Sequence, residues 1–356
     1  MAIQYLSGNR ATGTASDRAG LTTYSTKSWV ELGRYTATSN TDTLTVSSLS
    51  TANYPYLVVL THTIKNGTIE PLLQFNSDTG SNYSRRYTAN GSGNSTNINQ
   101  AGIETTYEGV SPTAFKILHI SNVANQEKLI YLEDCEENTA GEGNTPNRIE
   151  VAGKWANTSD QITSVSLDHN SSGNFATGSE LVVLGVKSSG TDTSKAGFWQ
   201  ELADLELSSA GDTLDTSTIT AKKYLWIQAF IPEGAGHHGY IYFNNDTGSN
   251  YARRGSINGG SDITTTDDDE INWSHDTNSA KYLNMFVINK SDKEKLCIAE
   301  YMDYGSSGAG NAPNRIEWVY KWANTSAQIT SVKLYNNQAS SNDFPIGTTL
   351  KVWGSD

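Results

Sequence analysis

Two pairs of neighbouring arginines stand out as side chains suited to binding another group. Arg85 and Arg86 end the segment FNSDTGSNYSRR, and Arg253 and Arg254 end the similar segment FNNDTGSNYARR. Because neighbouring side chains on a strand point to opposite faces, one arginine of each pair is expected to point inward and the other outward. Guanidinium groups bind carboxylates in two-point contacts. The pairs therefore predict either structural ion pairs or the recognition of an anionic ligand or partner.

Two tryptophans occupy the same position in a second repeated segment, KWANTS. These are Trp155 and Trp322. An exposed indole ring is a stacking platform for a sugar ring, whereas a buried one anchors a loop or fills a core. Both interpretations stay open on the sequence. The candidate contacts for a partner or a glycan are therefore Arg85, Arg86, Trp155, Arg253, Arg254 and Trp322.

Carboxylates near the repeated segments permit two further interpretations. Glu150 and Glu317, each in a PNRIE segment, are candidate structural partners for the arginine pairs. Glycoside hydrolysis needs two carboxylates on either side of the scissile bond, and Glu133, Glu136 and Glu150 are the candidates for that chemistry. The usual motifs of nucleophile elbows, phosphate-binding loops and zinc proteases do not occur. We expect no catalytic residue and a protein that is not an enzyme.

Metal and cofactor sites are also not expected. Asp78 and Asp246 each stand in an N-x-D-x-G-x-N segment that resembles an oxygen-rich calcium loop, but each lacks the further acidic residues of such a loop. Adjacent His237 and His238 would point to opposite faces of a strand. We interpret the aspartate segments as structural turns and predict no metal and no cofactor.

Composition and charge exclude several classes of protein. The chain of 356 residues carries 25 Lys and Arg against 38 Asp and Glu, a formal charge of −13, which disfavours binding to nucleic acid. No apolar run approaches the roughly 18 residues of a membrane span, and the first residues lack the pattern of a secretory signal. Two cysteines, Cys135 and Cys297, are too few for a disulfide framework and are predicted to be free thiols.

The chain is an internal duplication. Besides the arginine and KWANTS segments, Trp29-Val-Glu-Leu matches Trp199-Gln-Glu-Leu, and the copies are offset by about 167 residues. Two copies of that length are complete domains and not the short units of a solenoid. We predict an N-terminal arm over residues 1–27, a first repeat over 28–187, a flexible linker over 188–198 and a second repeat over 199–356.

The elements that hold these residues are predicted to be strands. Apolar residues recur with period two or in short runs separated by Gly, Asn, Asp and Pro, and no stretch shows a helical period. A hairpin is expected at residues 76–82. The predicted fold class is all-β, with two tandem antiparallel β-sandwiches of jelly-roll type, and a closed barrel is the alternative. The expected strands of the first repeat are 29–35, 56–64, 72–75, 83–87, 114–120, 128–133, 148–152, 162–167 and 180–186, and those named for the second are 224–231, 282–288 and 295–300.

Taken together, these segments resemble a repeat module of virion structural proteins from environmental tailed phages. The resemblance rests on YLSGNR, W-x-E-L-G-R, D-T-L, F-N-x-D-T-G-S-N-Y-x-R-R, P-N-R-x-E and K-W-A-N-T-S-x-Q-I-T, and it covers both repeats. The second repeat departs from the pattern at its start. The resemblance implies a capsid decoration, head-fibre or tail-fibre component located in the virion after assembly in the host cytoplasm.

Further expectations follow for partners. The resemblance implies contacts with other virion proteins and a homo-oligomer, with a trimer favoured, and no contact with nucleic acid or membrane. We hypothesise that the arm and the first repeat attach to the particle while the second repeat faces outward. The alternative function is a pair of carbohydrate-binding modules for a host-surface glycan, and a glycan-degrading enzyme is the third.

Overall fold

The computed structural model describes residues 29–106, 112–169, 171–186, 197–234, 237–273, 278–303, 305, 309–337 and 343–356. Within these ranges the chain contains strands and no α-helix, so the predicted all-β class is confirmed. No helix in them is long and apolar enough to cross a membrane. The predicted arm and residues 188–196 of the predicted linker lie outside the described ranges.

Among the described residues, thirteen strands lie in the first repeat and twelve in the second. The strands of the first are β1 (Val30–Thr36), β2 (Leu44–Val46), β3 (Tyr56–Asn66), β4 (Pro71–Phe75), β5 (Tyr83–Ala89), β6 (Ser95–Gln100), β7 (Ile103–Glu104), β8 (Thr113–Ser121), β9 (Lys128–Glu136), β10 (Asn147–Trp155), β11 (Val165–His169), β12 (Asn174–Phe175) and β13 (Glu180–Val186). Those of the second are β14 (Gln200–Glu206), β15 (Thr213–Asp215), β16 (Tyr224–Ile231), β17 (Tyr240–Phe243), β18 (Tyr251–Ile257), β19 (Ile263–Asp268), β20 (Ile271–Asn272), β21 (Lys281–Ile288), β22 (Lys295–Asp303), β23 (Asn314–Trp322), β24 (Val332–Tyr335) and β25 (Thr349–Ser355).

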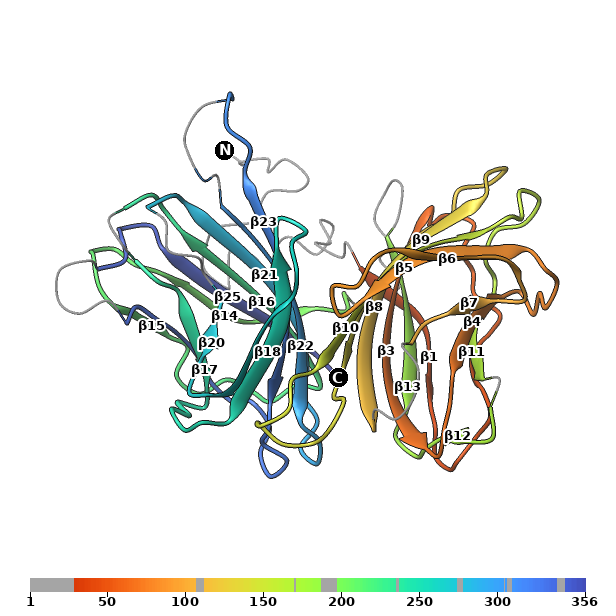
Figure 1. The fold of residues 1–356 in the computed structure, drawn as a ribbon, viewed down its shortest axis with the longest axis horizontal. Helices are drawn as coiled ribbons and strands as arrows, with labels where there is room; N and C mark the ends of the chain where they lie inside the picture. The colour runs from red at the N-terminus through yellow and green to blue at the C-terminus, as the bar shows by residue number, and fades with distance from the viewer. Residues whose placement is uncertain are drawn as a thin grey trace, which may run out of the picture.

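Each repeat folds into two antiparallel sheets, and the two repeats share one strand order. The large sheet of the first repeat runs β1-β13-β3-β8-β9-β10-β5-β6, with β12 paired to β3, and its small sheet runs β2-β11-β4-β7. The second repeat repeats both orders as β14-β25-β16-β21-β22-β23-β18-β19 and β15-β24-β17-β20. These are two tandem jelly-roll-like β-sandwiches, which Figure 1 shows side by side, with the first in red to green and the second in green to blue.

The core of each sandwich lies between its two sheets. Alternation along the strands places one set of side chains inward, such as Leu132 of β9 and Val151 of β10, both fully buried. Tyr83, Trp155 and Phe75 pack together in the first core, and Tyr251, Trp322 and Phe243 do so in the second. Burial of these faces is the main force that holds each sandwich together.

The expected hairpin at residues 76–82 is wrong. β4 and β5, which flank it, belong to different sheets, so the segment is a corner between the two layers. The turn that starts it has positive φ at Asn76 and Ser77, with φ of 52° and 56°, and the amide of Asp78 donates to the carbonyl of Phe75. Asn244 and Asn245 repeat this geometry. The sequence signal marked a turn correctly, but the sheet partners of its two arms depend on the whole fold.

The strands predicted in the first repeat are all present, with small shifts at their ends. The largest shifts are of three residues, as in β11, which begins at Val165 and not at Ile162. The short strands β2, β6, β7 and β12 were not predicted. β6 consists of Ser, Thr, Asn, Ile, Asn and Gln, and most of its side chains are exposed, so it lacks the apolar alternation on which the prediction depended.

Candidate functional site

The two candidate tryptophans are buried and cannot stack on a glycan. Trp155 is 0 % exposed and Trp322 is 1 % exposed. Each indole Nε1–H donates to an aspartate Oδ2, of Asp78 and Asp246 respectively, with an N–O distance of 2.7 Å in both cases. The hypothesis of sugar-stacking tryptophans is therefore wrong, because the rings fill the cores and anchor the repeated corners.

Both aspartates hold their corner loop by the same set of hydrogen bonds. Asp78 accepts from Trp155, from the amide of Gly80 and from the side-chain amide of Asn82. Burial raises the pKa of Asp78, but these three donors outweigh it and lower the pKa below its ordinary value. Among the described residues no group of three or more acidic, His or Cys side chains is arranged to hold a metal.

The inward arginine of each pair is bound within its own sandwich. Arg85 donates to the carbonyl of Glu104 at 2.6 Å and forms an ion pair with the carboxylate of that residue. Arg253 donates to the carbonyl of Asn272 and to Thr265. Glu150 is a candidate partner for one arginine of the pair, but Arg85 does not reach it, because Arg85 lies opposite Gly153 and points to the other face of the sheet.

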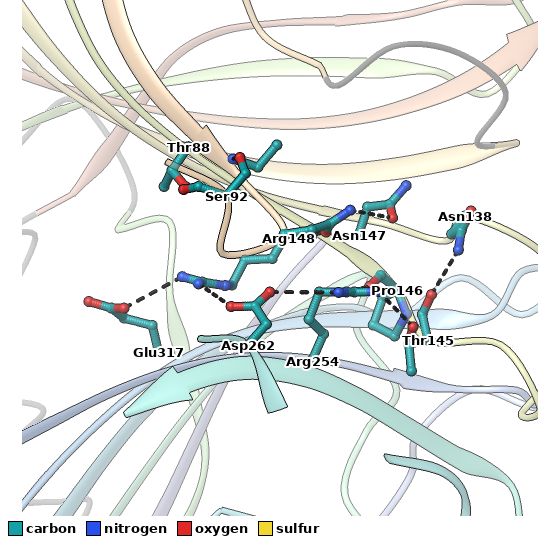
Figure 2. A network of polar contacts seen from close by, with 12 residues as sticks. Thr88, Ser92, Asn138, Thr145, Pro146, Asn147, Arg148, Arg254, Asp262 and Glu317 are labelled. Carbon is teal, nitrogen blue, oxygen red and sulfur yellow. Dashed lines mark hydrogen bonds and ion pairs between the residues drawn. The ribbon is translucent and has the colours of Figure 1, made fainter. Parts of the chain in front are cut away.

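The outward arginines differ between the repeats. Arg86 is exposed, whereas Arg254 reaches across to the first sandwich. Its guanidinium donates to the carbonyl of Pro146 at 2.8 Å and to the hydroxyl of Thr145 at 2.9 Å, and it lies 3.7 Å from Asp262 (Figure 2). The structure thus places one of the six candidate side chains at the contact between the sandwiches.

That contact has an apolar core of its own. It lies between the outer faces of the two large sheets, where Phe115 packs on Tyr224 with ring centroids 6.3 Å apart, and Trp29 stacks on Trp226. Its buried residues are Val58, Leu60, Phe115, Ile117, Cys135, Val182, Leu184, Phe198, Tyr224, Phe286, Ile288, Leu296, Ile298 and Val319. Phe198, which we placed in a flexible linker, is buried in this core, so the linker prediction is wrong at its end.

Arg148 connects the two sandwiches beside this apolar core. Its guanidinium bonds Glu150 of its own sheet at 2.5 Å. It also bonds Asp262 of the second sandwich at 2.6 Å and lies 3.5 Å from Glu317 (Figure 2). The side chain is 6 % exposed. Sequence reasoning used the PNRIE segment to find the repeat and to single out its glutamate, but it did not single out the arginine.

Four glutamates gather where Arg148 lies. Glu133 pairs in register with Glu150 across β9 and β10, and Glu300 pairs in register with Glu317 across β22 and β23. Like charges directly opposite on neighbouring strands destabilise a sheet. Arg148 supplies a buried positive charge, and Arg315, whose side chain is 68 % exposed, bonds Glu317 at 2.7 Å. We name these four glutamates the carboxylate cluster.

The carboxylate cluster has strongly perturbed protonation. Burial raises the pKa of Glu133 well above its ordinary value, and the charges of Glu300, Glu150 and Glu317 raise it further. The pKa values of Glu150 and Glu300 are raised for the same first reason, burial. Glu136 is the third candidate for hydrolytic chemistry. Because side chains alternate along β9, it points to the inner face of the sheet, whereas Glu133 and Cys135 point to the outer face.

The space beside the cluster is small. A cavity of about 10 Å³ lies between Glu133, Arg148, Glu150, Glu317 and Val319, which is close to the least that holds one water molecule. A sugar ring does not fit there. The predicted free thiols are confirmed, and both are buried, Cys135 in the contact between the sandwiches and Cys297 in the core of the second sandwich.

The loop between β9 and β10, residues 137–146, clasps the second sandwich. The amide of Gly141 donates to Glu294 at 2.6 Å, and Lys321 donates to the carbonyl of Thr139 at 2.6 Å. Glu294 and Lys321 are themselves buried and lie 3.4 Å apart as an ion pair. Buried ionic contacts of this kind restrict how two bodies pack, because each charge needs its partner.

Comparison with known proteins gives weak likenesses. No family model matches the chain, and the search of curated proteins found no match. Among solved structures, the LG1-3 region of the laminin alpha2 chain is 10 % identical, with a TM-score of 0.21 and coverage of 90 % of this chain and 64 % of that one. Mouse laminin alpha1 domains LG4-5 are 11 % identical, with a TM-score of 0.20 and 93 % of each chain covered. A xylan beta-1,4-xylosidase from Bacillus halodurans is 10 % identical with a TM-score of 0.23, covering 72 % of this chain and 67 % of that one. This chain therefore spans just under two thirds of the first of these structures.

Proposed function

We propose that the protein is a non-enzymatic structural component of a tailed-phage virion, a capsid decoration, head-fibre or tail-fibre protein that displays two β-sandwiches. The observation that carries the proposal is the apolar core between the two large sheets, which joins the duplicated sandwiches. Such a contact suits a protein whose task is to hold loops in a set position on a particle. The location in a virion is inferred from the resemblance of the repeated segments to virion structural proteins.

The character of the conspicuous polar residues supports a structural task. Asp78 and Asp246 clamp the corner loops, and Arg148 and Lys321 join the sandwiches. Glu133 and Glu136, two of the three candidates for hydrolytic chemistry, are 9 % and 1 % exposed. Their burial disfavours glycoside hydrolysis as the function.

The carbohydrate-binding alternative loses its predicted platforms, because Trp155 and Trp322 are buried. A glycan array on the purified protein tests what is left of it. We expect no glycan to bind. A glycan that binds to both the wild type and the Trp322→Phe variant would favour the alternative and would place its site elsewhere.

The virion proposal is tested on particles. Phage particles are purified on a density gradient from the culture that carries the gene, and the protein is sought by mass spectrometry and by immunogold labelling. We expect it in the particle band at a constant ratio to the major capsid protein, with gold on the head or the tail. Its presence in the soluble fraction alone would contradict the proposal.

A further inference from the structure

The outer faces of the two large sheets are equivalent in strand order. The sandwiches contact each other through one end of this face in the first repeat and through the other end in the second. Register establishes the equivalence: Tyr56 of β3 lies opposite Ser121 of β8, as Tyr224 of β16 lies opposite Ile288 of β21. Ala114 opposite Glu136 corresponds in the same way to Lys281 opposite Asp303. Each position on one outer face therefore has a known counterpart on the other.

The half of each face that is in contact is apolar and buried. The first sandwich contributes Val58, Leu60, Phe115, Ile117 and Cys135, which we name the A half. The second contributes Tyr224, Phe286, Ile288, Leu296, Ile298 and Val319, which we name the B half. The positions of the A half do not correspond to those of the B half. The contact is thus heterologous, since two different patches of the repeated unit face each other.

The counterparts of these residues form the unused halves. The unused B half, on the first sandwich, consists of Tyr56, His119, Ser121, Leu129, Tyr131 and Ala152. The unused A half, on the second, consists of Gln228, Tyr282, Asn284 and Met302, with Phe230 beside them as the counterpart of buried His62. Trp226, the counterpart of Val58, is not part of it, because it already packs on Trp29 in the used contact.

The unused halves hold most of the apolar side chains that the described residues expose. Tyr56, Leu129 and Tyr131 are 56 %, 59 % and 40 % exposed, and Phe230 and Met302 are 41 % and 51 % exposed. These are five of the eight large hydrophobic residues exposed in the described part of the chain. A soluble protein gathers exposed apolar residues on equivalent faces where a partner covers them.

The basic side chains around the used contact are also repeated around the unused halves. Arg254 and Lys321, which bind the loop of residues 137–146, have Arg86 and Lys154 as counterparts on the first sandwich. Arg148 has Arg315 as its counterpart on the second. These three basic groups of the used contact therefore have basic counterparts at the equivalent places around the unused halves.

We propose that the partner of these surfaces is a second copy of this chain. The unused A half of one copy binds the unused B half of another and reproduces between molecules the contact that the structure shows between repeats. Each half presents exposed apolar side chains in a single chain, such as Leu129 and Met302, and a second copy would cover them. A heterologous contact either closes into a ring, such as the expected trimer, or continues as a filament. This inference does not depend on the virion proposal.

Paired cysteine variants test the geometry of the contact. In the used contact, the rings of Phe115 and Tyr224 have centroids 6.3 Å apart. Their counterparts on the unused halves are Tyr282 and Tyr56 respectively. The purified variants Tyr282→Cys and Tyr56→Cys are mixed under mild oxidation. We expect a disulfide-linked dimer of about twice the chain mass from the mixture and at least about tenfold less from either variant alone, because the contact is heterologous.

Control variants distinguish a specific contact from cross-linking that results from chance collisions or misfolding. A mixture of Ile346→Cys, exposed but on neither face, with Tyr56→Cys is expected to give only background cross-linking. Native Cys135 and Cys297 are buried and do not compete. Equal dimer yields from single variants and from the mixture, or no dimer at all, would overturn the proposal.

Mass in solution provides the second measurement. We expect size exclusion with light scattering to show the wild type at a multiple of 38.6 kDa. The Leu129→Lys and Met302→Lys variants, one on each unused half, are expected to associate at least about tenfold more weakly, and Ile346→Lys is expected to behave as wild type. A wild type that stays at 38.6 kDa at the highest concentration would overturn the proposal.

Discussion

At the residue scale, an aspartate at the equivalent position stabilises the corner loop in both repeats. Asp78 and Asp246 each accept an indole N–H, a glycine amide and an asparagine amide from their own corner loop. The loop therefore keeps its shape through one carboxylate. A calcium ion is not needed to hold a corner that is already closed by three donors.

Replacement of Asp78 with alanine is expected to lower the free energy of unfolding by about 2 kcal/mol, because the buried indole N–H of Trp155 loses its charged acceptor. Asp246→Ala is expected to cost a similar amount. Urea unfolding followed by tryptophan fluorescence measures both. Asp160→Ala, at an exposed aspartate, is the control, and a loss in the control as large as in Asp78→Ala would contradict the clamp.

Glu133 is expected to make stability depend on pH in an unusual direction. Its pKa is raised in the folded protein, so its stabilising contribution is full below the ordinary carboxyl pKa and is lost as the pH rises through the raised value. Glu133→Gln is therefore expected to melt roughly 1–2 °C higher than wild type at pH 8, the effect of about 1 kcal/mol in a chain of 356 residues. The difference is expected to shrink toward pH 5.

Scanning fluorimetry across this pH range makes the measurement. Glu206→Gln, at an exposed position, provides the control and is expected to melt with the wild type at every pH. A Glu133→Gln variant that is less stable than wild type at pH 8 would show that the ionised carboxylate is favourable in its place.

At the scale of elements, the loop of residues 137–146 joins the two repeats. It belongs to the first sandwich but binds Glu294 and Lys321 of the second. The equivalent ion pair in the first sandwich, Glu127 with Lys154, has side chains 42 % and 43 % exposed. One pair of residues thus occurs as a buried and as an exposed contact in the same molecule.

This duplication supplies a matched experiment. Glu294→Ala is expected to lower the free energy of unfolding by about 3 kcal/mol, because buried Lys321 is left without its carboxylate. It is also expected to speed hydrogen exchange at the amide of Gly141, which loses its acceptor. Glu127→Ala is expected to cost less than about 1 kcal/mol. Equal losses in the two variants would contradict the role of burial.

At the scale of the whole molecule, the contact between the sandwiches makes the duplicated chain one unit. Its apolar core joins both large sheets, and Arg148 bonds carboxylates of both sandwiches. We expect the wild type to unfold in a single calorimetric transition because neither sandwich loses its partner surface without cost.

The variant Ile298→Asp is expected to split that transition into two, because Ile298 is 3 % exposed in the centre of the contact. Its counterpart in the first repeat, Tyr131, is 40 % exposed, so Tyr131→Asp provides the matched control in dilute solution. A single unchanged transition in Ile298→Asp would show that the sandwiches are coupled by other means.

The sequence alone determined the longer strands, the duplication and the presence of a turn at each corner. Each of these depends on local signals: apolar alternation in segments such as residues 56–64, the offset of the repeated motifs, and the Asn-rich turns at residues 76 and 244. It also predicted that the two arginines of each pair point to opposite faces, which the period of a strand requires.

Only the tertiary structure decided which of these residues meet. It buried Trp155 and Trp322, placed the arms of the corner in different sheets, and gathered Glu133, Glu150, Glu300 and Glu317 around Arg148. It also gave equivalent residues opposite environments, since Ile298 is buried where Tyr131 is exposed. The physical reason is that the repeated segments are similar in sequence, whereas the choice of which end of each face is covered depends on how two complete sheets pack. No local sequence pattern indicates which end of each face is covered.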